Sequence, residues 1–473
     1  MSGARRTEGI DRRRLLRGAG AALAAPPIGR FLWTREDAAT PAAPHHAPRA
    51  RALIHLHMAG APSQMDLFDP KPVLAGRDGE PCPDALLEGK RFAFIHGRPV
   101  LLGSPFAFRR HGASGAWLSE LLPHLATVAD EVAFVRSMRT EEFNHAPAQL
   151  LLGSGSPRFG RPGIGAWLSW ALGPTGGFLP AYVVLVSGGR VPSAGASLWS
   201  AGFLPSAHQG VEFRSGGSPV LFLDDPPGTR RADRRRLLDA LHDLNELAHA
   251  RHGDPETTSR SQQYELAHHM QTAVPAAVDL SLEPAAVLEG YGATPGAAGF
   301  AEHCLLARRL VEDGVRIVQL YDWGWDHHGS GEHDDLTVNL PRKCAAVDRP
   351  VAALVADLRS RGMLDETLVL WTGEFGRTPM RENRNDAGFV GRDHHGDGFT
   401  VWMAGGGARP GVTYGATDEL GAEVAEDPVE VFDLQATLLH LFGFDHERLT
   451  YPFQGRDFRL TDVAGRVIPE LVA

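Results

Sequence analysis

Short β-prone runs alternate with longer helical patterns along most of this chain. The β-prone runs, which are rich in Val, Ile, Leu and aromatic residues, lie at 52–58, 132–135, 182–186, 315–320, 367–371 and 399–403. Apolar residues recur with helical spacing at 232–251, 258–272, 298–313, 345–361 and 429–442. Strands that alternate with helices favour a mainly parallel sheet covered by helices on both faces. The sequence therefore predicts an α/β fold.

The size and composition of the chain suit one large domain of this class. It has 473 residues, of which 43% are hydrophobic and 22% are charged, as is common in soluble globular proteins. Residues 225–300 show helical patterns without a strand pattern, which predicts a helical insertion. We expect residues 49–473 to form a single domain that contains this insertion.

Charge, hydropathy and cysteine usage exclude several classes of function. The formal net charge is −10, so no basic surface for nucleic acid or anionic lipid is indicated. No apolar run is long enough for a transmembrane helix. The three cysteines are too few and too scattered for a disulfide framework or a thiolate zinc cage, although the sequence is compatible with one disulfide bond. Nothing in the sequence indicates an oligomeric state.

Residues 1–48 are interpreted as an export signal and a linker. A basic segment at 11–17, with consecutive arginines at Arg12, Arg13 and Arg14, precedes a small apolar stretch at 18–25. This order is similar to that of twin-arginine export signals. A segment rich in Ala, Pro and His follows, as is typical of linkers. The sequence predicts twin-arginine export to the periplasm or the extracellular space, and a disordered basic tail is the alternative interpretation.

Carboxylates and imidazoles cluster in loops beside the predicted strands. Those best suited to a metal site are Asp326, His328, Glu374, His394 and His395. Ligands of open α/β sheets bind at the carboxyl ends of strands, where the loops that hold Asp326 and Glu374 are expected. A mixture of Asp and His suits zinc, whereas carboxylate-rich sites suit calcium, magnesium or manganese. The sequence therefore predicts a divalent metal, with zinc, calcium and manganese as the candidates.

Other polar residues near the strand ends are candidates for binding and chemistry. Arg377 lies in a glycine-flanked loop and is suited to hold an oxyanion with two hydrogen bonds. Ser63 and Asp66 follow the first predicted strand, so Ser63 is a candidate nucleophile and Asp66 a candidate metal ligand; loop capping by Ser63 is equally compatible. His145 follows the strand at 132–135 and is a candidate proton donor to a leaving oxygen, with a structural hydrogen-bonding role as the alternative.

Longer motifs occur along almost the whole chain, at 56–72, 144–149, 325–328, 373–379, 391–395, 404–407 and 433–443. They include Trp325-Asp326-His327-His328 and Gly373-Glu374-Phe375-Gly376-Arg377. These motifs resemble those of a bacterial family of exported proteins known as domain of unknown function 1501 (DUF1501), which is similar to sulfatases and alkaline phosphatases. The segment at 433–443 resembles the closing helix of sulfatases.

The resemblance implies an alkaline-phosphatase-like α/β/α sandwich with metal at the carboxyl ends of its strands. It implies that Asp326 and His328 bind one metal, and that His395 or His394 supplies the third ligand. It also implies that Glu374 is a carboxylate of a second metal position.

This chain departs from relatives that have known hydrolase chemistry. Those relatives have an Asp directly after the first strand, where this chain has Met58, Ala59 and Gly60. They have a His after the later acid, where this chain has Phe375, and the Cys-x-Pro-x-Arg element of sulfatases is absent from the sequence. A site with one metal, and with Ser or water as the nucleophile, therefore stays open.

The leading hypothesis is an exported metal-dependent hydrolase of sulfate or phosphate esters. A metal would polarise a phosphoryl or sulfuryl oxygen and supply affinity for an anionic ester, of which a sulfated glycan is one form. A non-catalytic exported protein that keeps the fold and binds metal or glycans is the second hypothesis. An esterase that uses Ser63 is the third, although no Gly-x-Ser-x-Gly element surrounds this residue.

Overall fold

The computed structural model describes residues 43–473 except for 174–176, 215–218, 221–224, 226–227 and 383–387. The predicted export signal and most of the predicted linker, at 1–42, lie outside the described residues. In the described part of the chain, no helix is both long enough and apolar enough to cross a membrane.

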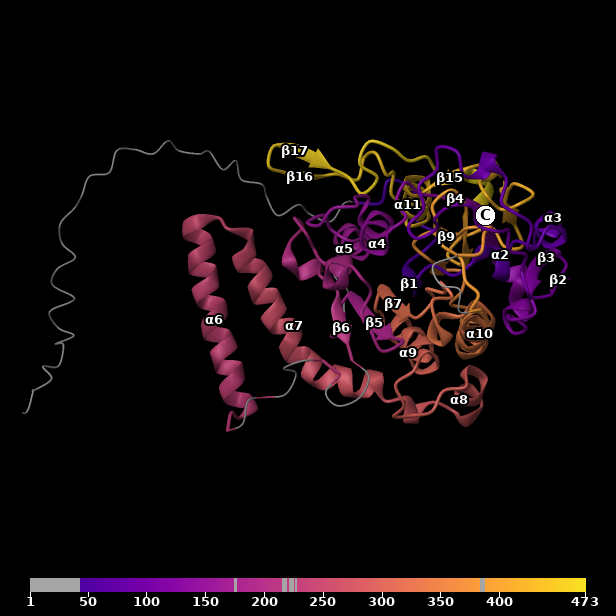
Figure 1. The fold of residues 1–473 in the computed structure, drawn as a ribbon. Helices are drawn as coiled ribbons and strands as arrows, with labels where there is room; N and C mark the ends of the chain where they lie inside the picture. Colours follow the sequence, from indigo (N-terminus) through magenta and orange to yellow (C-terminus); the bar gives the residue numbers. More distant parts are fainter. Residues whose placement is uncertain (1–42, 174–176, 215–218, 221–224, 226–227, 383–387) are drawn as a thin grey trace, which may run out of the picture. The chain divides into compact units, whose positions relative to one another are not determined.

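A nine-stranded sheet is the central layer of the fold (Figure 1). Its strands are β1 (Ala52–Ala59), β4 (Val132–Arg139), β5 (Tyr182–Ser187), β6 (Val211–Phe213), β7 (Ile317–Trp323), β8 (Thr367–Thr372), β11 (Phe399–Ala404), β12 (Thr413–Tyr414) and β15 (Val429–Glu430). The order across the sheet is β12, β4, β11, β8, β1, β7, β5 and β6, and β15 also pairs with β4. Only the pairs that β11 makes with β4 and β8 are antiparallel. The prediction of a mainly parallel sheet is confirmed.

Helices cover both faces of this sheet. The helices of the described residues, including those that do not contact the sheet, are α2 (Gln64–Leu67), α3 (Pro72–Gly76), α4 (His145–Ser154), α5 (Ile164–Leu172), α6 (Arg231–His252), α7 (Pro255–Val278), α8 (Ala285–Tyr291), α9 (Phe300–Glu312), α10 (Leu336–Ser360) and α11 (Val431–Leu441). Short two-stranded ribbons lie outside the sheet, formed by β2 (Phe108–His111) with β3 (Ala116–Ser119), β9 (Gly376–Arg377) with β10 (His394–His395), β13 (Ala416–Thr417) with β14 (Val424–Glu426), and β16 (Tyr451–Phe453) with β17 (Arg456–Phe458). The α/β/α arrangement predicted from the sequence is confirmed.

Two apolar cores flank the sheet because successive side chains of a strand point to opposite faces. In β8, Val369 and Trp371 belong to one core, whereas Leu368 and Leu370 belong to the other. Helices α7, α9 and α10 cover the first core, and α4, α5 and α11 cover the second. The three cysteines are buried free thiols, and Cys304 packs in the first core as expected.

The helical insertion is built mainly from α6, α7 and α8. No described residue of 225–300 lies in a strand, in agreement with the sequence pattern. Helices α6 and α7 pack along each other, as Figure 1 shows. Met270, Val274 and Ala277 of α7 are buried in the first core, so this helix connects the insertion to the sheet layer.

The predicted helix at 345–361 begins earlier than its apolar pattern indicated. Helix α10 begins at Leu336 because the Asp335 side chain accepts hydrogen bonds from the backbone N–H groups of Thr337 and Val338. The early start brings the loop after β7 close to the N-terminus of α10. That loop carries the candidate site residues Asp326 and His328, so its length and position determine where their side chains lie.

Gly60 lets the end of β1 approach the loop after β7 very closely. Its φ angle is +112°, and a Cβ atom built on it would lie 2.6 Å from the backbone nitrogen of Asp326. Real Cβ atoms essentially never come this close to another heavy atom. Only glycine therefore fits at this position, and the contact fixes where Asp326 lies.

We expect Gly60→Ala to displace the loop that carries Asp326. Gly160→Ala is a matched control, because Gly160 has a φ angle of +99° but no heavy atom within 4 Å of a built Cβ. Both substitutions strain the backbone by about 1–2 kcal/mol, and the clash adds about 1–3 kcal/mol in Gly60→Ala alone. Chemical denaturation measures the free energies of unfolding, and equal losses in the two variants would contradict the proposed close contact.

Candidate functional site

Side chains from separate segments of the chain meet near the carboxyl ends of the central strands. Asp326 and His328 lie in the loop after β7, His394 lies in β10, and His145 begins α4. The candidate ligand atoms of these four residues all lie within 4.8 Å of one another. The structure therefore brings together three predicted metal ligands and adds His145 as a fourth member of the cluster.

Asp326 is at the centre of this cluster. Its Oδ2 atom lies 3.2 Å from His145 Nε2, and its Oδ1 atom lies 2.8 Å from His328 Nε2 and 3.3 Å from His394 Nε2. The Nε2 atoms of His328 and His394 are 3.0 Å apart. The Asp326 side chain keeps 27% of its surface exposed, so the cluster is open to solvent on one side.

The three imidazoles of the cluster share one arrangement of hydrogen bonds. His145 Nδ1 lies 2.7 Å from Glu374 Oε1, His394 Nδ1 lies 2.8 Å from the carbonyl oxygen of Phe143, and His328 Nδ1 contacts Glu382 Oε2. Each of these oxygens can only accept, so each Nδ1 atom donates its proton outward. All three Nε2 atoms therefore point inward at Asp326.

This arrangement fits a divalent cation. Histidines that bind metals usually donate their other ring N–H to a carboxylate or a carbonyl group, which fixes the ring and increases its basicity. The Nδ1 atoms of His145, His328 and His394 all donate in this way. Asp326 supplies a carboxylate between the three Nε2 atoms. A donor set of three imidazoles and one carboxylate suits zinc better than calcium, which prefers oxygen ligands.

The charges of the cluster are consistent with this assignment. Burial opposes ionisation of Asp326, but Arg377 and the surrounding imidazoles hold the pKa of its carboxyl well below the usual range. Burial lowers the pKa of His394 to about 4, which keeps this ring neutral. Burial also acts to lower the pKa of His145, but Asp326 and Glu374 raise it to about 9. A cation at the cluster would therefore replace a proton on His145.

Arg377 holds the cluster in place through its own buried hydrogen bonds. Its Nε atom donates to the carbonyl oxygen of Ala61 at 2.9 Å, and its Nη1 atom donates to that of Arg392 at 3.0 Å. Its Nη2 atom donates to the carbonyl oxygen of Gly60 and to Asp326 Oδ1. The guanidinium predicted to bind an oxyanion thus has every nitrogen directed at a protein oxygen.

Glu374 is not a member of the four-residue cluster, but it contacts His145, which is a member. Its Oε1 atom accepts hydrogen bonds from His145 Nδ1, from Gln149 Nε2 at 3.0 Å and from the Gly60 backbone N–H at 3.0 Å. Burial opposes ionisation, but His145 and His57 hold the pKa of this carboxyl far below its usual range. Glu374, the predicted ligand of a second metal, is therefore ionised and orients the imidazole of His145.

Ser63 and Asp66 are buried together, apart from the four-residue cluster. The Ser63 hydroxyl donates to Asp66 Oδ2 at 2.5 Å. Asp66 also pairs with Arg392, whose Nε and Nη2 atoms lie 2.8 Å and 3.2 Å from its two oxygens. The structure therefore places the predicted nucleophile and the predicted ligand in a buried ion-pair network.

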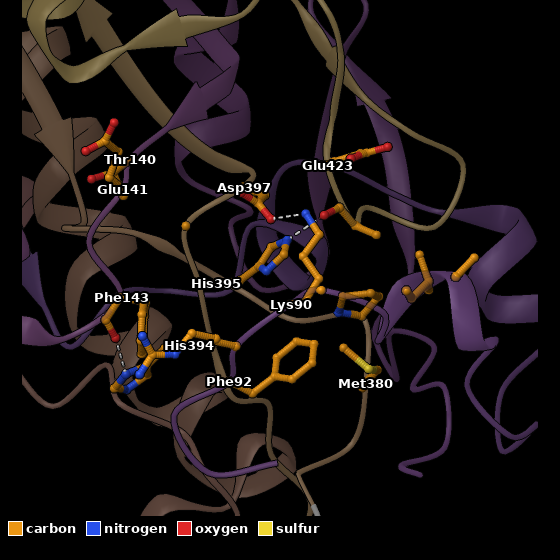
Figure 2. Close-up of a pocket in the computed structure, with 17 residues that line it drawn as sticks. Lys90, Phe92, Thr140, Glu141, Phe143, Met380, His394, His395, Asp397 and Glu423 are labelled. Carbon is orange, nitrogen blue, oxygen red and sulfur yellow. Dashed lines mark hydrogen bonds and ion pairs between the residues drawn. The ribbon is translucent and has the colours of Figure 1, made fainter. Parts of the chain in front are cut away.

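A cavity of about 290 Å³ borders the cluster, and His394 is one of its lining residues. Figure 2 shows that the two adjacent histidines diverge: His394 reaches the carbonyl oxygen of Phe143, whereas His395 points away from it. His395 Nε2 lies 2.6 Å from the carbonyl oxygen of Ala422. Charged residues of both signs line the cavity: Lys90, Arg91, Glu141, Asp397 and Glu423.

Two buried residues of the site escaped the sequence analysis. Glu382 contacts His328 Nδ1, and His57 Nε2 lies 3.5 Å from Glu374 Oε2. Glu382 follows a loop with no metal-ligand spacing, so no local signal marks it. His57 lies inside the first predicted strand, where alternation with the apolar residues Leu56 and Met58 was a signal of a polar position on one sheet face.

Comparison with known proteins identifies the family. The family described as "Protein of unknown function (DUF1501)" matches residues 50–472, so the chain belongs to this family. A search of curated proteins found no match.

Several solved structures are similar to this chain at low identity. A sulfatase from Pseudoalteromonas sp., PsFucS1, is 11% identical with a TM-score of 0.34, covering 84% of this chain and 69% of the sulfatase. The lipoteichoic acid synthase LtaP from Listeria monocytogenes is 9% identical with a TM-score of 0.35, covering 84% and 73% of the two chains. The alkaline phosphatase of the Antarctic bacterium TAB5 is 11% identical with a TM-score of 0.30, covering 77% and 94%.

Because His394 and His395 diverge, we expect their substitution to change metal binding to very different extents. We expect His394→Ala to weaken zinc binding by more than about 100-fold, beyond the loss typical of residues that only support a ligand. We expect His395→Ala to change zinc affinity by less than about 3-fold, because its Nε2 atom contacts the Ala422 carbonyl instead. Competition with a chelator measures both affinities, and a larger loss in His395→Ala would refute the assignment.

Proposed function

We propose that this protein is an exported metal-dependent hydrolase of sulfate or phosphate esters. The observation that carries the proposal is the convergence of three imidazole Nε2 atoms on Asp326 beside a cavity. His394 belongs to both the cluster and the cavity wall, so a molecule in the cavity would contact one of the four candidate ligands. The basic segment at 11–17 supports export.

His145, Asp326, His328 and His394 would hold the cation. When bound, a divalent cation at these ligands supplies a Lewis acid for an ester oxygen and lowers the pKa of a coordinated water. Glu374 and Glu382 orient the imidazoles, and Arg377 holds the Asp326 carboxylate.

Substrate and nucleophile are assigned from the remaining contacts. An anionic ester, of which a sulfated glycan is one form, would owe its affinity to the bound cation, because Glu141, Asp397 and Glu423 offset Lys90 and Arg91 at the cavity wall. Lys90 also forms an ion pair of 2.6 Å with Asp397 on the same wall. Water is the favoured nucleophile, because the Ser63 hydroxyl is buried and donates to Asp66 rather than facing the cluster.

One observation favours a second candidate function, a non-catalytic exported protein that binds metal. Structural zinc sites are closed by four protein ligands, whereas catalytic zinc keeps one position open for water. The cluster offers four protein ligands, so hydrolysis requires a fifth position. The exposed side of Asp326 is where that position would lie.

Metal analysis combined with an ester screen tests the proposal. We expect the purified protein to hold about one equivalent of divalent metal and to hydrolyse a sulfate or phosphate ester. Asp326→Asn removes the central carboxylate and should abolish both properties, whereas Asp365→Asn, at an exposed position, should change neither. Metal without turnover would favour the non-catalytic candidate, and a protein that takes up no zinc, calcium or manganese would overturn the proposed function.

A further inference from the structure

A row of buried polar side chains runs from Glu374 into the core covered by α4, α5 and α11. We call Gln319 of β7, His55 and His57 of β1, and Thr372 of β8 the polar row; all four residues are buried. The parallel register sets His55 beside Gln319 and His57 beside Thr372. Side chains paired in this way share one face of the sheet, so the row is continuous across three adjacent strands.

The orientation of Gln319 sets the direction of the hydrogen bonds. Its Oε1 atom accepts from the buried hydroxyl groups of Tyr182 and Tyr321, the latter at 3.3 Å. Its Nε2 atom therefore donates to His55 Nδ1 at 3.0 Å. Because this nitrogen accepts, the proton of a neutral His55 ring must be on Nε2. Burial lowers the pKa of His55 well below its usual value, so the ring is neutral.

The same direction continues along the rest of the polar row. His55 Nε2 donates to Thr372 Oγ1 at 2.8 Å. The threonine hydroxyl has one proton, and we infer that it donates this proton to His57 Nδ1, which lies 2.9 Å away. The proton of the His57 ring is then on Nε2, which lies 3.5 Å from Glu374 Oε2 in an electrostatic contact without a hydrogen bond.

We propose that the polar row positions His145 by holding Glu374 through a fixed His57 tautomer. With the His57 N–H facing Oε2, the carboxylate keeps Oε1 for His145 Nδ1, and His145 Nε2 remains directed at Asp326. Gln319, His55, Thr372 and His57 are thus positioning residues. This inference rests on the proposed function, because its purpose is to present His145 to a cation.

The energetics of burial support a functional reason for the polar row. A buried polar group that loses its partner costs about 1–3 kcal/mol, whereas apolar side chains of similar shape can fill such positions without that risk. Leu53 lies on the same face of β1 and packs in the surrounding apolar core. Apolar residues would therefore suit these positions of the core. We attribute the polar side chains at these positions to a role in positioning the cluster.

The tautomers of the histidines test the direction of the row in the full-length parent protein. Nitrogen-15 chemical shifts of the imidazoles distinguish a ring protonated at Nε2 from one protonated at Nδ1. We expect His55 and His57 both to carry the proton on Nε2, with and without zinc. A proton on Nδ1 of either ring would reverse the row and overturn the inference.

Paired substitutions of Thr372 test whether the row acts on the cluster. Thr372→Val removes the hydroxyl and keeps the shape, and we expect it to weaken zinc binding by about 10-fold and to change the His57 nitrogen-15 shifts. Thr372→Ser keeps the hydroxyl and should stay within about 3-fold of the parent. Unchanged zinc affinity and shifts in a folded Thr372→Val protein would overturn the inference; if this variant does not fold, the parent tautomers decide.

The outcomes separate this inference from the proposed function. A parent protein that takes up no metal overturns the proposed function and removes the purpose of the row. A parent protein that binds zinc but has Nδ1-protonated His55 or His57 overturns the positioning inference alone.

Discussion

Neutralising the Asp326 carboxylate is the constraint on which the arrangement of the site depends. A charge held among protein groups is destabilising unless it is paired and hydrogen-bonded, and leaving such a charge unpaired typically costs several kcal/mol. Arg377 supplies the pairing, and the same guanidinium donates to the carbonyl oxygens of Gly60, Ala61 and Arg392. One side chain thereby ties together the end of β1, the loop after β7 and the loop before β10.

Strand β1 connects this site to the rest of the fold. Ile54, Leu56 and Met58 pack in one apolar core, whereas His55 and His57 point to the opposite face. A strand with period-two alternation can therefore stabilise the sheet on one side and carry a hydrogen-bonded row on the other. A shift of β1 by one residue would exchange these faces and bury the two imidazoles among apolar side chains.

The sequence predicted the fold more completely than the site because strand signals are local. Buried strands such as β8 appear as short runs of large apolar residues, whereas α5 escaped prediction because it is buried almost all round and shows no polar face. Asp326 and His328 were found because they are close in sequence. Which ring nitrogen faces the cluster depends on partners such as Glu382, which only the folded chain supplies.

The hydrogen bonds of Glu374 use one of its two carboxylate oxygens. A second cation at the position implied by the resemblance would need Glu374 as a ligand. Its Oε1 atom already accepts from Gly60, Gln149 and His145, whereas its buried Oε2 atom has no hydrogen-bond partner among the described residues and lies 3.5 Å from His57 Nε2. The chain also lacks a carboxylate directly after β1, where Gly60 instead presents its backbone N–H to Glu374. Glu374 therefore orients His145 through Oε1, and Oε2 is the Glu374 oxygen that remains for a second cation.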